Sequence, residues 1–271
     1  MKIILSRKGF DSANGGIVSP IMEDGTLLSF PIPSNDMDKF EDLTYCGQSY
    51  TKILKDLKYK ENPKYPNCHL DPDLSPDRRT ILVEDWRPIF GQEKSSAIYL
   101  KNTVEVKPGD IFLFFGNYHK VQLTDGKYHY VKRSGDFYSD NDLQVIWGYM
   151  QVGKIIDCPN EQKKYDWHPH SKKKYTSEQS NVMFMARDCL SFNENLSGAD
   201  LLKYREDRVL TAKNCNKATW VKRSIYDVNS IIGNRKNSSK TPDGIYYAGI
   251  WQELGLCETP ECEKWAKSII L

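Results

Sequence analysis

The sequence predicts a mixed α+β protein built on a mostly antiparallel, barrel-like sheet with helices at its periphery. Residues 104–156 are rich in apolar runs separated by glycine-containing turns, which is typical of β structure. Helical patterns outside this stretch are short. A length of 271 residues fits one large domain or two small ones. We predict a single domain over residues 1–271, with 104–156 as its β-rich core.

The first 60 residues predict a strand, a polar loop, a hairpin and a helix. Residues 2–6 are apolar enough for a short buried strand, and the polar, glycine-rich residues 7–16 follow as a loop. Asp24-Gly25 is a dipeptide typical of hairpin turns. Apolar residues at helical spacing within 49–59 predict a helix.

The middle of the chain changes from irregular to β-rich. Residues 61–88 contain five prolines and no periodic pattern, and a loop of this length is usually functional or disordered. The apolar run 111–115 predicts a buried strand, residues 119–142 a hairpin, and residues 144–156 a strand pair or one bent strand. Further strands or small helices are expected at 181–185, 201–210, 225–232 and 261–270, and an exposed loop at 230–243.

Charge and composition narrow the possible partners. The net charge of +2 excludes a global polycation, so any anion site must be a local patch. The strongest apolar run is far shorter than the ~20 residues that span a bilayer, and no secretory signal is visible. The seven cysteines are irregularly spaced, as expected for reduced thiols. We therefore expect a cytoplasmic protein without a membrane partner.

No standard catalytic signature occurs, so function must be argued from weaker clusters of residues. The first cluster is the loop after the first predicted strand, with Arg7, Lys8, Asp11, Ser12, Gly15 and Gly16. Arg7 offers a planar donor fork for phosphate, and the glycines would let backbone N–H groups approach an anion. Asp11 is a candidate catalytic base, and Ser12 a candidate substrate contact. The alternative is a polar turn in which Arg7 pairs with Asp11.

The second cluster is His69-x-Asp71-x-Asp73. One imidazole and two carboxylates within five residues could ligate a divalent metal. His69 and Asp71 could equally form an acid–base pair, with Asp73 contacting the substrate. The alternative is a loop that its aspartates stabilise locally.

The third cluster is His168-Pro169-His170, where alternate spacing in an extended segment would put both rings on one face. The two rings could ligate Zn²⁺ together with a third group or contact a substrate. Cations and aromatics alternate around them from Lys163 to Tyr175, a composition suited to phosphate contact and base stacking. This run predicts contact with a nucleotide or with DNA; the alternative is a solvated basic loop.

Taken together, these segments resemble the nucleotide modification associated domain 3 family. The resemblance is carried by residues 3–12, 15–16, 19–21, 31–33, 69–74, 90–92, 109–116 and 168–170. It implies a link to gene neighbourhoods of bacteriophages and bacteria that make or process modified nucleotides in DNA, and it implies no particular reaction. Gln92, in the Phe-Gly-Gln segment, becomes a candidate substrate contact. Residues 92–100 are more charged than the family pattern, and residues 193–240 carry no family motif.

A shorter similarity links residues 104–156 to the small barrels of the pseudouridine-synthase-and-archaeosine-transglycosylase (PUA) type, which read modified bases. It rests on residues 106–110 and 148–153.

These observations favour an enzyme that acts on a nucleotide or a base in nucleic acid, by group transfer or hydrolysis. Arg7 would hold phosphate, Asp71 or Asp11 would act as general base, and His69 as acid or orienting group. The alternatives are a non-catalytic reader of a modified base and a structural accessory of a modification complex. We assign no metal, and the sequence leaves any cofactor open.

Overall fold

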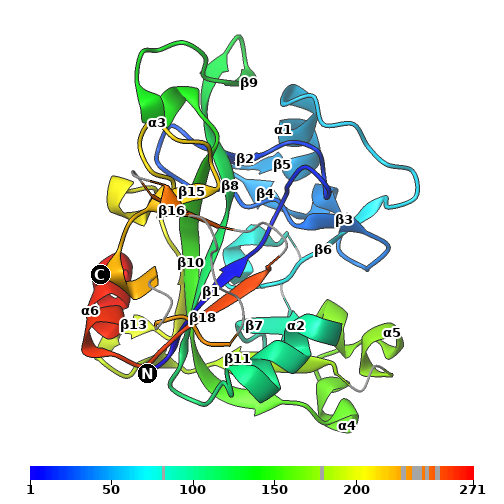
Figure 1. Ribbon diagram of the computed structural model, residues 1–271. Helices are drawn as coiled ribbons and strands as arrows, with labels where there is room; N and C mark the ends of the chain where they lie inside the picture. The colour runs from blue at the N-terminus through cyan, green and yellow to red at the C-terminus, as the bar shows by residue number, and fades with distance from the viewer. Residues whose placement is uncertain (81–82, 178–179, 227–229, 234–239, 242–243, 248–250) are drawn as a thin grey trace.

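The computed structural model describes residues 1–80, 83–177, 180–226, 230–233, 240–241, 244–247 and 251–271. Its described strands include a nine-stranded mixed sheet in the centre of the molecule (Figure 1). The path of this sheet is β18 (Glu253–Leu256), β1 (Ile3–Arg7), β8 (Ile111–Thr124), β10 (Leu143–Ile156), β11 (Val182–Ala186) and β7 (Ile89–Gln92). To this path are added β2 (Ser19–Ile21) and β9 (Lys127–Tyr130), which pair with β8, and β14 (Ala199–Leu201), which pairs with β10.

The two long strands β8 and β10 form the middle of the sheet and pair antiparallel. Residues 144–156 are therefore one bent strand, with a register shift between Ile146 and Gly148. β1 and β2 run parallel to β8, whereas the other pairings of the sheet are antiparallel. Because β8 contributes buried side chains to clusters on both faces, its first residues read as one continuous apolar run.

Successive residues of β8 point to opposite faces of the sheet. Phe114 packs beside Phe90 on one face, with ring centroids 5.2 Å apart. Phe115 packs on the other face against Trp220, at 5.3 Å. The sheet thus separates two hydrophobic clusters, and both of its faces are covered by other parts of the chain.

Smaller sheets and short helices surround this core. The paired strands are β3 (Ile32–Ser34) with β6 (Asn67–His69), β4 (Thr44–Tyr45) with β5 (Gln48–Ser49), β12 (Cys189–Leu190) with β13 (Asn193–Ser197), and β17 (Gly244–Tyr246) with β15 (Thr219–Val221) and β16 (Lys240–Thr241). The helices are α1 (Tyr50–Asp56), α2 (Lys94–Ile98), α3 (Phe137–Asp140), α4 (Pro159–Gln162), α5 (Lys173–Thr176) and α6 (Pro260–Ile270). A π-helical turn, Tyr99–Thr103, continues α2, and 3₁₀ turns cover Phe40–Asp42, Pro76–Arg78, Pro169–Ser171, Glu206–Arg208 and Ser224–Tyr226.

The two longest helices begin at side-chain caps. The Ser49 hydroxyl accepts from the backbone N–H of Lys52 at the start of α1. Thr259 does the same for Cys262 at the start of α6, where Pro260 occupies the first turn. The predicted helix within 49–59 is therefore present, and the segment 261–270, predicted as either a strand or a small helix, is helical. Both helices turn apolar faces into the core.

The mixed α+β class is confirmed, but the described strands form an open path from β18 to β7 and no closed barrel. The similarity to PUA-type barrels stays a prediction, as does the single-domain assignment. Parts of the segments predicted at 225–232 and 230–243 lie outside the described residues. No helix within the described ranges has the length and apolar character needed to cross a membrane.

Candidate functional site

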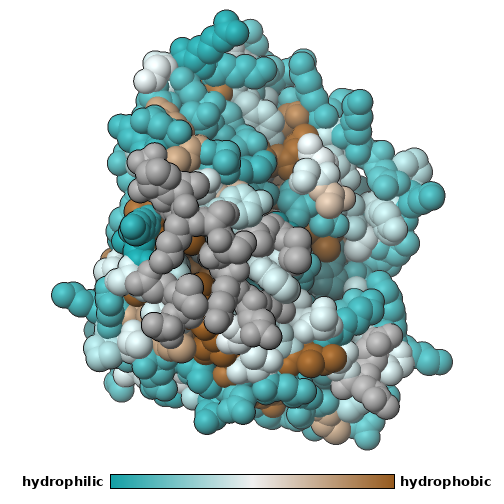
Figure 2. Space-filling view, viewed as in Figure 1, coloured by the Kyte–Doolittle hydropathy of each residue, from teal (hydrophilic) through white to brown (hydrophobic). Residues whose placement is uncertain are grey.

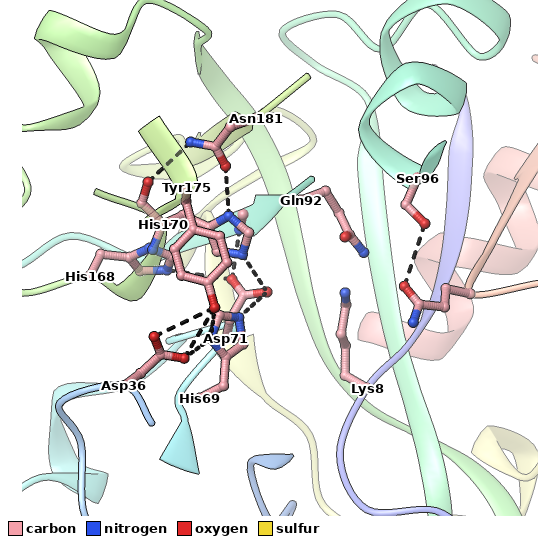
Figure 3. Close-up of polar contacts among 12 residues, drawn as sticks. Lys8, Asp36, His69, Asp71, Gln92, Ser96, His168, His170, Tyr175 and Asn181 are labelled. Carbon is pink, nitrogen blue, oxygen red and sulfur yellow. Dashed lines mark hydrogen bonds and ion pairs between the residues drawn. The ribbon is translucent and has the colours of Figure 1, made fainter. Parts of the chain in front are cut away.

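Two segments about 100 residues apart meet beside the sheet. His69 is the last residue of β6 and Asp71 follows two positions later, whereas His170 lies in the 3₁₀ turn Pro169–Ser171. Each of the three side chains offers one ligand atom within 4.8 Å of the other two. Figure 3 shows them converging, with His168 to their left and the Tyr175 ring in front. We call His69, Asp71 and His170 the triad.

Asp71 is buried, and its two carboxylate oxygens have different neighbours. Its Oδ1 accepts a hydrogen bond from the backbone N–H of Gly91 at 2.6 Å and lies 3.4 Å from Nε2 of His168. Its Oδ2 lies 4.0 Å from Nε2 of both His69 and His170. Burial alone would raise the pKa of Asp71, but the adjacent His168 and the positive charge of Lys8 hold that pKa well below its usual range.

His69 is oriented by a carboxylate on its far side. Its Nδ1 lies 2.8 Å from Oδ2 of Asp36, and the Tyr175 hydroxyl donates to the same oxygen at 3.2 Å. Burial opposes ionisation of Asp36, but the hydrogen bond and charge of His69 outweigh it and lower the pKa of Asp36 to about 2. A carboxylate behind an imidazole fixes both the ring orientation and which nitrogen carries the proton. The Nε2 of His69 is therefore the nitrogen that faces Asp71.

His170 is oriented in the same way by an amide. Its Nδ1 lies 2.8 Å from Oδ1 of Asn181, whose own nitrogen donates to Gln162 at 2.8 Å and to the His170 carbonyl at 3.0 Å. Tyr175 stacks on the ring, with centroids 4.6 Å apart. Burial lowers the pKa of His170 to about 3, so this ring is neutral near pH 7.

The triad forms part of the wall of a cavity of about 1120 Å³. The loop after β1 forms another part of the wall, together with residues from the segments around β3, α2 and Trp251. In Figure 2 the surface is recessed to the right of centre, between the region of α1 and that of α2. A cavity of this volume is as large as typical ligand sites in proteins.

Lys8 and Gln92 belong to the same cavity and extend beside the triad (Figure 3). Both contact the buried carboxylate of Glu253: the Lys8 ammonium lies 3.7 Å from its Oε1, and Gln92 donates a hydrogen bond to the same oxygen. Lys8 also lies over the ring of Phe90, 4.4 Å from its centroid. These contacts fix a cation and an amide in the cavity wall.

Ten of the twelve predicted site residues line this one cavity. They are Arg7, Lys8, Asp11, Ser12, Gly15, Gly16, His69, Asp71, Gln92 and His170. His168 does not line it, because it is fully buried behind Asp71. His168 nevertheless lies in the same group of rings: the ring centroids of His69 and His170 are 5.1 Å apart, and those of His168 and His170 are 5.8 Å apart.

Asp73 lies away from the cavity lining. It is fully buried, and its Oδ2 accepts from Arg79 at 2.9 Å and from the Trp86 indole at 2.9 Å. Arg79 also pairs with Asp38 at 2.6 Å. These contacts place Asp73 in a structural ion-pair cluster within the 61–88 segment, which Arg79 connects to Asp38. The substrate contact expected for Asp73 stays a prediction.

The loop after β1 has the geometry of a polar turn. The Asp11 carboxylate accepts from the backbone N–H groups of Ala13 and Asn14 at 2.9 and 2.7 Å, and Arg7 lies 3.5 Å from its other oxygen. The N–H of Gly16 donates to the Asp11 carbonyl at 2.9 Å. Three amides that could have cradled an anion therefore have partners within the loop. The catalytic role of Asp11 stays a prediction.

Asp36 and Asn181 belong to the site although no sequence motif indicated them. Asp36 and Asn181 act through the histidines that they orient, and neither lies beside those histidines in the sequence. Tyr175 ends the basic run for which the sequence predicts base stacking, and in the structure it packs on His170 and donates a hydrogen bond to Asp36. The polar run around residue 36 contains no pattern that would connect it to His69.

The chain is therefore an α+β protein with a large cavity, and a cluster of two histidines and one aspartate forms part of the cavity wall. The family model of nucleotide modification associated domain 3 matches residues 2–246, so the chain belongs to that family. The description of the family connects the chain with nucleotide modification. Neither the curated proteins nor the solved structures contain a significant match.

Proposed function

We propose that this chain is an enzyme that modifies a nucleotide or a nucleotide base, by group transfer or hydrolysis, at the triad. The observation that carries the proposal is the convergence of His69, Asp71 and His170 on one wall of a ligand-sized cavity. Buried polar side chains with perturbed pKa values in a cavity are the usual mark of a reacting centre. The family's connection with nucleotide modification supports a nucleotide as the substrate.

The rest of the cavity suits a nucleotide. Tyr59, Tyr65 and Trp251 supply aromatic faces on which a base can stack, and Arg7, Lys8 and Lys174 supply positive charge for phosphate. Lys174 is exposed at the cavity, and its ammonium donates a hydrogen bond to the Tyr175 hydroxyl at 3.2 Å. In this arrangement the phosphate would lie toward the lysines and the reacting group toward the triad.

A second candidate function is a non-catalytic reader of a modified base or nucleotide. The aromatic lining of the cavity favours it as much as it favours an enzyme, because both must hold a base. The exposed lysines between Lys163 and Lys174 would in either case contact a DNA backbone next to the cavity. Whether the bound molecule is converted distinguishes the two candidates.

The experiment is mass spectrometry of small molecules released from the purified full chain, followed by nucleoside analysis of DNA and of the nucleotide pool in cells that express it. The test variant is Asp71→Asn, which keeps an oxygen to accept from Gly91 but removes the charge at the triad. An enzyme gives a new nucleoside or nucleotide with the wild-type chain and at least about 100-fold less with the variant.

A reader gives a different pattern. Both chains then release the same nucleotide, and neither changes the nucleoside composition of the cells. If no nucleotide is released and no composition changes, the proposed function is wrong in both forms. His129→Ala is the control, because His129 is exposed on β9 and outside the cavity lining.

A further inference from the structure

We propose that His69, Asp71 and His170 bind a divalent transition-metal ion through Nε2, a carboxylate oxygen and Nε2, respectively. The inference goes beyond the proposed function, because it requires only these three side chains and no nucleotide. The three ligand atoms lie within 4.8 Å of one another, and all three side chains line the cavity.

The hydrogen bonds of the two histidines leave their Nε2 atoms as acceptors. The Nδ1 of His69 faces the carboxylate of Asp36, which can only accept when ionised. The Nδ1 of His170 faces the oxygen of Asn181, because the Asn181 nitrogen is used in its bonds to Gln162 and to the His170 carbonyl. Each Nδ1 therefore carries a proton, so Nε2 is the nitrogen of each ring whose lone pair can bind a cation.

The third acceptor is Oδ2 of Asp71. The other oxygen of this carboxylate is taken by the Gly91 N–H, which fixes the direction of Oδ2. Oδ2 lies 4.0 Å from each Nε2, too far for a hydrogen bond. These three atoms thus face one another without a hydrogen bond from either Nε2 to Oδ2, and one cation placed between them can bind all three at once.

Lys8 does not replace such a cation. Its ammonium is 3.7 Å from the buried carboxylate of Glu253 and lies over the ring of Phe90. In Figure 3 it stands beside the triad on the side of Gln92, where it is placed to meet an anionic substrate.

The donor set selects the class of metal. Two imidazoles and one carboxylate suit Zn²⁺, Fe²⁺, Co²⁺ and Mn²⁺, whereas Ca²⁺ and Mg²⁺ prefer oxygen ligands. Ligands about 2.1 Å from a tetrahedral ion are roughly 3.4 Å apart, so the two 4.0 Å separations would close by roughly 0.6 Å on binding. Partners behind both histidines are typical of metal sites, where they fix the ligand rings.

Three protein ligands leave the remaining coordination positions of the ion free. Because the triad lies in the cavity wall, these positions face the space that a substrate would occupy. Open positions of this kind distinguish catalytic from structural metal sites. The ion would supply a Lewis acid for group transfer or hydrolysis.

The test is a Co²⁺ titration of the full chain after removal of metals with a chelator, followed by visible absorption. The absorption spectrum of bound Co²⁺ indicates which kinds of atom ligate it. This information is needed because the described residues include seven free cysteines, whose thiolates also bind metals. We expect one equivalent of Co²⁺ with d–d bands of a nitrogen–oxygen ligand set and no near-ultraviolet thiolate band. Asp71→Asn and His69→Gln should each weaken binding by at least about tenfold.

His129→Ala, at the exposed position on β9, is the matched control and should bind Co²⁺ as the wild type does. Circular dichroism of each metal-free variant checks that it is folded. The proposal is wrong if the wild type binds no Co²⁺, if the spectrum shows thiolate ligation, or if the folded triad variants bind like the wild type. Co²⁺ uptake without nucleotide conversion would support this inference and contradict the proposed enzyme, whereas conversion by a wild-type chain that binds no Co²⁺ would support the enzyme and overturn the metal site.

Discussion

Gly91 lies directly against the imidazole of His170. A Cβ built on Gly91 would be 2.8 Å from the Cβ of His170 and closer still to its ring, nearer than real Cβ atoms come to other atoms. The same glycine donates its N–H to Asp71. One backbone position on β7 therefore fixes the distance between two members of the triad.

Gly91→Ala should consequently disturb the triad more than the fold. The φ of Gly91 lies outside the left-handed region, so alanine fits the backbone, and the clash must move the His170 ring. We expect roughly 1–3 kcal/mol of destabilisation, as for overpacked sites, and a loss of at least about tenfold in metal affinity or turnover. The measurements are chemical denaturation and Co²⁺ titration of the same preparation. Unchanged Co²⁺ binding would contradict this prediction, because it would show that metal binding does not depend on the position of the His170 ring.

Lys174→Ala should weaken nucleotide binding while Lys173→Ala should not. Both lysines are exposed on α5, but Lys174 lines the cavity and Lys173 does not. Loss of one charge-assisted contact to phosphate corresponds to a drop in affinity of about tenfold. The measurement is calorimetric titration with the nucleotide that co-purifies. An equal loss in both variants would instead indicate that the whole run 163–175 contacts a polyanion, as expected for DNA.

Two leucines on β8 offer a matched test of the core. Leu113 is fully buried, whereas Leu123 is 45% exposed near the end of the strand. Leu113→Ala removes packing atoms and leaves a cavity, so it should cost about 2–5 kcal/mol of unfolding free energy. Leu123→Ala should change stability by no more than about 0.5 kcal/mol. Urea denaturation measures both, and similar values for the two would contradict the assignment of β8 to the centre of the sheet.

His119 should make stability depend on pH. Burial alone would lower the pKa of His119, but its hydrogen bonds to Asp142 and to the Val131 carbonyl outweigh burial and raise the pKa. The protonated ring is therefore favoured in the folded state, so its stabilising contribution is fully present below the unfolded pKa of about 6.5. That contribution is lost as the pH rises through the folded pKa. Asp140 and Lys217, which pairs with Asp142 at 3.2 Å, are the other charged groups nearby.

The experiment compares the wild type with His119→Gln at pH 5.5 and pH 9. The difference in unfolding free energy should be larger at pH 5.5 by about 1 kcal/mol, the typical net value of one such hydrogen bond. His129→Ala, an exposed histidine on β9, should show no such change. A difference that is equal at both pH values would contradict the role of the protonated ring.

The amino-acid sequence by itself determined those features that depend on neighbours in the chain. The apolar run at 111–115 predicted a buried strand, and the spacing within 49–59 predicted α1, because burial and helix formation leave periodic patterns. Ten of the twelve candidate site residues line one cavity. The sequence indicated them because polar side chains that gather in otherwise irregular segments are often functional.

Only the tertiary structure decided which of these residues meet. His69 and Asp73 stand four positions apart, yet one faces the cavity and the other is enclosed by Arg79 and Trp86. Asp36 reaches His69 through the pairing of β3 with β6, and Asn181 reaches His170 just before β11. Contacts between distant segments depend on strand pairing and packing, which a local sequence pattern does not encode. The open path of the sheet likewise follows from long-range pairing, so the sequence alone could not distinguish it from a barrel.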